Sequence, residues 1–175
     1  MTESIDLRDY IRDVPDFPQA GVLFRDITPL LQSPAAFESA LVALTGYVAG
    51  RTPDAIVGIE SRGFIFGTPI AARLGLPFVP IRKPGKLPAA HMSVEYALEY
   101  GSGQLDIHSD ALRRGQSVVI VDDLLATGGT AVGACKLVEL IQGKVAGIAF
   151  LIELEALGGR ERLEDYEVFS VLRYA

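Results

Sequence analysis

The sequence contains a single cysteine, Cys135, so it cannot form a disulfide within one chain. It also lacks any apolar run approaching the roughly 20 residues that a membrane-spanning helix needs. The opening segment, MTESIDLRDYIRDV, is polar and acidic, and we expect no secretory signal there. These features predict a protein of the reducing cytoplasm that does not insert into a membrane.

Basic residues are outnumbered: 16 Lys and Arg stand against 22 Asp and Glu, which gives a net charge of −6. Nucleic-acid binding generally requires a basic face, so this balance argues against a nucleic-acid partner. The two histidines, His91 and His108, have neither metal-ligand spacing nor a supporting motif. We interpret both histidines and Cys135 as structural residues.

The chain is long and apolar enough for one domain with a sizeable core, with 175 residues and 49% hydrophobic content. Strand-like apolar runs alternate with segments of helical periodicity. We expect strands at 55–59, 77–81, 118–121, 145–153 and 167–173. We expect helices at 4–13, at 64–74, after Thr130, and from Pro34 onwards, with Ser33 as the N-cap. This alternation predicts an α/β fold with a mainly parallel central sheet flanked by helices.

Residues 82–104 depart from this alternation, with two prolines, three glycines and several charges. A long excursion inside a compact domain is usually functional or mobile. We interpret it as a flexible lid whose tip forms a hairpin. Leu105 and Ile107 suggest a short returning strand behind it.

The most informative segment is VVIVDDLLATGGT, residues 118–130. Its β-branched run predicts a strand buried on both faces. Asp122 and Asp123 follow, and two carboxylates at a strand end can accept hydrogen bonds from the vicinal hydroxyls of a ribose. The loop Ala126-Thr127-Gly128-Gly129-Thr130 then leads into a helix, where backbone N–H groups and the helix dipole favour a phosphate. The motif predicts a ligand with a 5-phosphate and a ribose diol. It is neither a Walker loop nor a dinucleotide fingerprint.

Three loops, 60–63, 82–88 and 122–130, each follow an expected strand. In open parallel sheets, ligands bind outside the carboxyl ends of the strands, where the strand order reverses. A phosphorylated ligand also needs local positive charge in this acidic chain. The nearby suppliers are Arg62, Arg82, Lys83 and Lys86.

The 118–130 segment resembles the phosphoribosyl-pyrophosphate motif of type I phosphoribosyltransferases, and LLATGGT is similar to their adenine-specific branch. The resemblance continues in the family's order over nearly the whole chain. It includes Phe24-Arg25-Asp26-Ile27, Ser61-Arg62-Gly63-Phe64, Ile81-Arg82-Lys83, Gly85-Lys86-Leu87-Pro88, Leu98-Glu99-Tyr100-Gly101 and Gly159-Arg160-Glu161. It implies a single domain over residues 1–175 with the type I fold, a small N-terminal base-binding hood over 1–33 and a flexible lid over 82–104.

The resemblance also implies an activity: transfer of the 5-phosphoribosyl group from phosphoribosyl pyrophosphate to adenine, giving AMP and pyrophosphate in purine salvage. We expect Mg²⁺ to be held mainly by the substrate, with no direct protein ligand, and we expect a homodimer. Two alternatives stay open. One is a transferase for 6-oxopurines or xanthine, and the other is a non-catalytic regulator that senses phosphoribosyl pyrophosphate.

The family's residue roles can be carried over where its motifs match. Glu60, Ser61 and Arg62 are expected at the pyrophosphate, with a cis Glu60–Ser61 peptide as a hypothesis, and Arg62 is also counted as catalytic. The remaining expected substrate contacts are Arg82, Lys83 and Lys86 for pyrophosphate, Asp122 and Asp123 for the diol, and Ala126, Thr127, Gly128, Gly129 and Thr130 for the 5-phosphate.

For the purine, Phe24 is expected to stack on the base, while the Leu23 carbonyl and the Arg25 N–H read its edge. Glu99 is the candidate general acid/base. Tyr100 is expected to orient Glu99 or to cover the site.

Overall fold

A computed structural model of the chain describes residues 5–97 and 101–175. The chain forms two compact units, Met1–Ala43 and Leu44–Ala175, and the boundary falls inside helix α2 (Pro34–Gly50). The single domain with a base-binding segment over 1–33 remains a prediction.

The first unit contains a two-stranded antiparallel sheet. Its elements are the 3-10 helix η1 (Leu7–Tyr10), the strands β1 (Arg12–Pro15) and β2 (Leu23–Asp26), the helix α1 (Thr28–Gln32) and the beginning of α2. The expected helix over 4–13 is wrong in its described part. Ile11 is extended and its N–H closes the η1 turn on the Arg8 carbonyl, after which the chain pairs with β2. Strand pairing therefore prevails over the weak helical pattern.

Helix α2 begins where the sequence predicts. Pro34 is its first residue, and the Oγ of Ser33 accepts a hydrogen bond from the Ala36 N–H at 3.3 Å. A hydroxyl cap satisfies one unpaired donor of a helix start, and proline at the first position removes another without losing a helical hydrogen bond.

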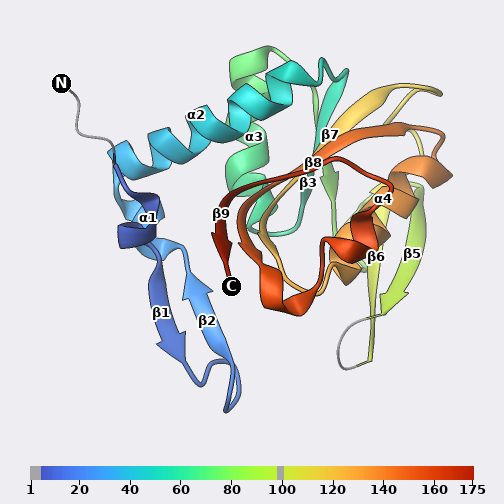
Figure 1. Cartoon of the computed structure of the whole chain (residues 1–175). Helices are drawn as coiled ribbons and strands as arrows, with labels where there is room; N and C mark the ends of the chain where they lie inside the picture. The colour runs from blue at the N-terminus through green and yellow to red at the C-terminus, as the bar shows by residue number, and fades with distance from the viewer. Residues whose placement is uncertain (1–4, 98–100) are drawn as a thin grey trace. The chain divides into compact units, whose positions relative to one another are not determined.

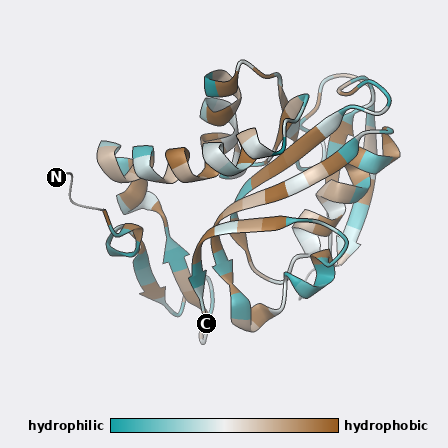
Figure 2. Ribbon diagram, turned by 45° about the horizontal axis from the view of Figure 1, so that its top comes forward, coloured by the Kyte–Doolittle hydropathy of each residue, from teal (hydrophilic) through white to brown (hydrophobic). Residues whose placement is uncertain are grey.

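The second unit is built on a sheet whose five described strands are all parallel, in the order β4-β3-β7-β8-β9 (Figure 1). The strands are β3 (Ala55–Ile59), β4 (Phe78–Ile81), β7 (Ser117–Leu125), β8 (Lys144–Leu154) and β9 (Val168–Tyr174). Every residue of β3 and all of Val118–Val121 are buried. The continuous apolar runs therefore belong to strands covered on both faces, as Figure 2 shows by their brown colour.

Helices cover the two faces of this sheet. Val57, Ile120 and Phe150 belong to one core cluster with the buried side of α4 (Gly129–Leu140). On the opposite face α3 (Gly63–Leu74) packs against β3, where Gly58 of the strand and Gly67 of the helix both leave room for the ring of Phe78. The strand and helix predictions for this unit are confirmed, except that the strand expected at 118–121 continues to Leu125. Two short 3-10 helices, η2 (Glu155–Leu157) and η3 (Glu161–Leu163), connect β8 to β9.

The excursion contains an antiparallel hairpin. Strands β5 (His91–Ala97) and β6 (Ser102–His108) pair from His91↔His108 to Ala97↔Ser102. The returning strand suggested by Leu105 and Ile107 is confirmed, and both side chains are buried. Its mobility as a lid stays a prediction.

The start of α3 supplies a test of this packing. A Cβ on Gly63 would lie 2.6 Å from the backbone oxygen of Val121, which cannot move without shifting β7. Gly63→Ala should therefore lower the free energy of unfolding by about 1–3 kcal/mol in urea titrations. The matched control is Gly46→Ala, in α2, where a Cβ would meet nothing within 4 Å. It should stabilise by about 0.5–1 kcal/mol. Equal effects of both variants would contradict this account of α3 docking.

Candidate active site

Strand β7 is longer than its neighbour β3, and this difference exposes two carboxylates. The pairing with β3 stops at Gly58↔Val121, whereas the pairing with β8 continues to Leu125↔Glu153. Asp122 and Asp123 therefore lie within β7, not after it, so the expected strand end at Val121 is wrong. Continued hydrogen bonding to β8 carries the strand four residues further.

The acid pair lies at the reversal of strand order. From β3 the chain steps to β4 on one side and later returns to β7 on the other. The loop after β3 therefore lies beside the carboxyl end of β7, and the Nε of Arg62 lies 2.5 Å from an Oδ of Asp123. The Glu60–Ser61 peptide bond is cis, in agreement with the hypothesis from the sequence.

A cavity of about 450 Å³ lies between these loops. It is lined by Glu60, Ser61, Arg62, Lys83, Tyr96, Leu105, Asp122, Asp123, Leu124, Leu125, Ala126, Thr127, Gly128, Gly129, Thr130, Ala131 and Phe150. Most of the residues expected at the substrate are therefore together. The volume is within the range of small-molecule sites in general.

The loop 126–130 ends at a helix N-terminus. Gly128 has a φ of +81°, a left-handed conformation that favours glycine, and α4 starts at the next residue. The first N–H groups of a helix have no partner inside it, and the helix dipole adds partial positive charge. This end of the cavity can bind an anion through the backbone alone.

The acid pair is electrostatically costly. Burial raises the pKa of Asp122 well above its usual range, and the neighbouring carboxylate of Asp123 raises it further. Burial also raises the pKa of Asp123, although the Arg62 guanidinium opposes this shift. Two close carboxylates with poor solvation favour a ligand that offers hydroxyl donors or positive charge.

The expected pyrophosphate cations separate into two groups. Arg62 and Lys83 line the cavity, whereas Arg82 and Lys86 do not. Arg82 instead donates to both carboxylate oxygens of Glu60, at 3.3 and 3.2 Å, and to the Lys86 carbonyl at 3.1 Å. These hydrogen bonds from Arg82, together with the Lys83 N–H, lower the pKa of Glu60. Arg82 thus ties the loop after β4 to the loop after β3.

Several lining residues were missed by sequence reasoning. Phe150 pairs with Asp122 across β7 and β8, a neighbourhood that only the strand register reveals. Tyr96 comes from the hairpin, and its ring lies against Gly103 and Gly133. The apolar Leu124 and Leu125 follow the acids directly in the motif, and this adjacency could have identified them.

The expected purine contacts lie in the first unit. Leu23, Phe24 and Arg25 lie in β2, where the Phe24 ring packs edge-on against Phe17 with centroids 5.2 Å apart. Arg25 forms an ion pair with Asp13. A second hollow of about 280 Å³ is lined by Val14, Phe17, Phe24 and Asp26. Phe17 was not expected from the sequence.

Glu99 and Tyr100 lie outside the described residues, so their expected roles stay predictions. Within 5–97 and 101–175, no helix is long and apolar enough to cross a membrane. The same residues contain no cluster of three or more His, Cys, Asp or Glu that could hold a metal ion.

A glycine loop at a helix N-terminus beside an acid pair, at the reversal of a parallel sheet, is an arrangement suited to phosphorylated sugars and nucleotides. The phosphoribosyl transferase domain family matches residues 27–173. An adenine phosphoribosyltransferase from Roseiflexus castenholzii is 57% identical over 171 residues, which cover 98% of this chain and 99% of that protein.

Solved structures agree with the sequence relatives. The adenine phosphoribosyltransferase of Thermoanaerobacter pseudethanolicus superposes with a TM-score of 0.93 at 51% identity, covering 96% of this chain and 98% of that one. The Saccharomyces cerevisiae enzyme, complexed with adenine and an imino-altritol bisphosphate, gives 0.90 at 39% identity and covers 94% and 96%. The chain belongs to the phosphoribosyltransferase family and, within it, to the adenine phosphoribosyltransferases.

The raised pKa of Asp122 predicts a pH-dependent stability change. A carboxyl group with a raised pKa in the folded state binds its proton more tightly there than when unfolded, so its ionised form costs stability at higher pH. Asp122→Asn should therefore raise the Tm by about 2–4 °C at pH 8. At pH 5 the gain should be smaller. Thermal denaturation at both pH values measures this, and a larger gain at pH 5 would contradict the assignment.

Proposed function

We propose that this protein transfers the 5-phosphoribosyl group of phosphoribosyl pyrophosphate to adenine, giving AMP and pyrophosphate. The observation that carries the proposal is the juxtaposition of Asp122 and Asp123 with the 126–130 loop and Arg62 around one cavity. These groups match the three parts of the donor substrate: a ribose diol, a 5-phosphate and a pyrophosphate. The relatives named above support adenine as the acceptor.

In this mechanism the two carboxylates perform two tasks. They accept hydrogen bonds from the 2- and 3-hydroxyls, and they favour the positive charge that develops on the ribose ring as pyrophosphate leaves. Fixed charges aimed at a developing charge act strongly where water is excluded. The 126–130 loop holds the 5-phosphate, so the reacting carbon is oriented from both ends of the sugar.

The leaving group needs cations. Arg62 and Lys83 are assigned to the pyrophosphate, and Arg82 keeps Lys83 at the cavity through its contacts with Glu60. The oxygen-rich lining, with Glu60, Asp122 and Asp123, suits a hydrated Mg²⁺ carried by the substrate. When bound, Mg²⁺ would neutralise charge on the pyrophosphate.

The acceptor is assigned to the first unit. Phe24 and Phe17 offer aromatic surface to a purine ring, while the Leu23 carbonyl and the Arg25 N–H offer an acceptor beside a donor. Adenine presents the complementary pattern, an exocyclic donor next to a ring acceptor. A 6-oxopurine presents the reverse pattern and would leave buried polar groups unpaired.

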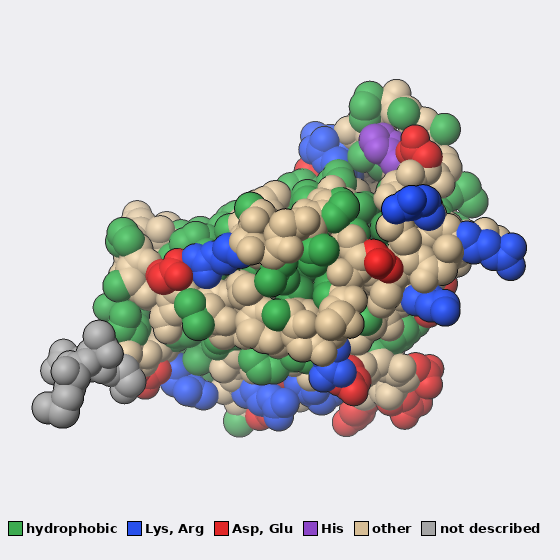
Figure 3. Space-filling view, turned by 90° about the horizontal axis from the view of Figure 1, so that it is seen from above, with side chains coloured by type: hydrophobic (Ala, Val, Ile, Leu, Met, Phe, Trp, Pro, Cys, Tyr) green, Lys and Arg blue, Asp and Glu red, His purple; other side chains and the backbone are tan. Residues whose placement is uncertain are grey.

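The cellular setting is also proposed. The resemblance supports a homodimer, and the single buried Cys135 fits a reducing cytoplasm. The acidic composition disfavours a nucleic-acid partner. On the face drawn in Figure 3, the described Lys and Arg side chains are interspersed with Asp and Glu.

The choice of base distinguishes this proposal from its alternatives. Supplied with phosphoribosyl pyrophosphate and Mg²⁺, the protein should convert adenine to AMP, with hypoxanthine, guanine and xanthine slower by about 10⁴-fold. Chelation of Mg²⁺ by EDTA should suppress the reaction. Comparable rates with a 6-oxopurine would establish the first alternative. Binding of phosphoribosyl pyrophosphate without turnover of any base would establish the sensing regulator.

The proposed proton transfer by Glu99 has its own test. Glu99→Ala should lower kcat by about 10²-fold or more while leaving the KM for adenine nearly unchanged, because the residue would act on a proton in the transition state. Glu95→Ala, at an exposed position of β5, is the control and should keep wild-type rates. Unchanged turnover of Glu99→Ala at saturation would remove Glu99 from the mechanism.

A further inference from the structure

The backbone of the 126–130 loop, which we call the phosphate loop, lies directly against the turn at residues 158–159. A Cβ on Gly128 would lie 2.6 Å from the carbonyl oxygen of Gly159, and a Cβ on Gly159 would lie 2.1 Å from the carbonyl oxygen of Ala126. The neighbouring Gly158 has a φ of +64°. Backbone therefore lies directly against backbone here, with the Leu125 side chain beside the contact. A shift of the 158–159 turn must shift the loop.

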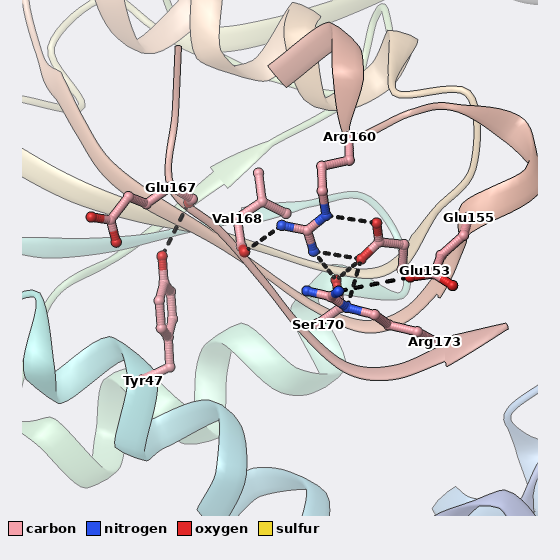
Figure 4. Close-up of polar contacts among 8 residues, drawn as sticks. All are labelled: Tyr47, Glu153, Glu155, Arg160, Glu167, Val168, Ser170 and Arg173. Carbon is pink, nitrogen blue, oxygen red and sulfur yellow. Dashed lines mark hydrogen bonds and ion pairs between the residues drawn. The ribbon is translucent and has the colours of Figure 1, made fainter. Parts of the chain in front are cut away.

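Arg160, the residue that follows Gly159, ties this turn to the sheet. Its guanidinium grips Glu153 with two hydrogen bonds, from Nε at 2.8 Å and from Nη2 at 2.5 Å (Figure 4). Its Nη1 also donates to the Val168 carbonyl at 2.8 Å, and its Nη2 reaches the Oγ of Ser170 at 3.3 Å. The planar fork thus joins the turn to both β8 and β9.

Glu153 is a firm anchor for this fork. It is only 2% exposed, and its Oε2 also accepts a hydrogen bond from the Ser170 hydroxyl at 2.7 Å. In the sheet it stands beside Leu125, the last residue of β7 before the loop. The 126–130 loop therefore begins next to Glu153 in the sheet, and Arg160 ties the 158–159 turn to the same position through Glu153. The hydrogen bonds of Arg160 lower the pKa of Glu153, so the carboxylate stays ionised.

We propose that Arg160, held by Glu153 and Ser170, is a positioning residue for the phosphate loop. It presses the 158–159 turn against 126–128 and so fixes the N–H groups that would receive the 5-phosphate. Arg160 itself has no place in the cavity lining and would not touch the substrate. The inference rests on the proposed function for the identity of the ligand, but its test uses binding as well as turnover.

The test replaces the fork while keeping the charge. Arg160→Lys retains a cation beside Glu153 but loses the planar, bidentate geometry. By titration calorimetry it should weaken the binding of ribose 5-phosphate by about tenfold, because a loop displaced by a fraction of an ångström no longer matches the phosphate. In the assay its KM for phosphoribosyl pyrophosphate should rise similarly, with the KM for adenine unchanged.

The matched control is Arg173→Lys. Arg173 also contacts Glu153, at 3.5 Å, and Glu155, at 3.7 Å, but it belongs to β9, whereas Arg160 directly follows the 158–159 turn. The same substitution there should change ribose 5-phosphate affinity less than about twofold. Equal weakening in both variants, or wild-type affinity in Arg160→Lys, would overturn the proposal.

Two further measurements keep the outcome decisive. If Arg160→Lys does not fold, Ser170→Ala carries the test and should weaken ribose 5-phosphate binding by about threefold, since one hydrogen bond to the anchor is lost. Unchanged affinity there overturns the proposal. A wild-type protein that binds ribose 5-phosphate but makes no AMP refutes only the proposed function. A wild type that binds none refutes the positioning role.

Discussion

The unequal lengths of β3 and β7 are the constraint on which the site depends. Because β7 continues to Leu125 while its pairing with β3 stops at Val121, Asp122 and Asp123 are held rigidly by β8 on one side and left open on the other. The open side receives Arg62 from the loop after β3. A parallel sheet normally ends in flexible loops; here two carboxylates are held by strand geometry before the loop begins. Their separation from the 126–130 loop is therefore fixed by backbone hydrogen bonds.

Much of this arrangement could be predicted from the sequence. The β-branched runs identified the central strands because burial on both faces leaves no polar alternation. Ser33 and Pro34 identified the start of α2, and the acids followed by ATGGT identified the loop and the following helix. Each of these signals is contained within a few consecutive residues, so it does not depend on contacts with distant segments of the chain.

The rest depended on register and on contacts between distant segments. The run past Val121 could not be seen, because hydrogen bonds to β8 decide where β7 ends. Phe150 reaches the cavity only through its pairing with Asp122. The expected helix over 4–13 was wrong because pairing with β2 outweighed a weak local pattern. The resemblance at 159–161 is visible in the sequence. The backbone contact between Gly159 and Gly128 joins distant segments, so the sequence does not predict it.

Charge is used locally in this acidic chain. Arg82 and Arg160 each donate two hydrogen bonds to a buried or partly buried glutamate, Glu60 and Glu153 respectively. The first pair ties down the loop after β4, and the second ties down the turn at 158–159. Bidentate pairing constrains direction as well as distance, which a single lysine contact does not. The positive charge offered to a ligand, by Arg62 and Lys83, is thus supported by cations that have no place in the cavity lining.

The central claim is that the acid pair binds the sugar and the following loop binds its phosphate. A crystal structure with AMP tests it most directly. The account predicts the ribose hydroxyls within hydrogen-bond distance of Asp122 and Asp123, with the phosphate on the backbone N–H groups of residues 127–130. Density for AMP elsewhere, with this cavity holding only water, would contradict it.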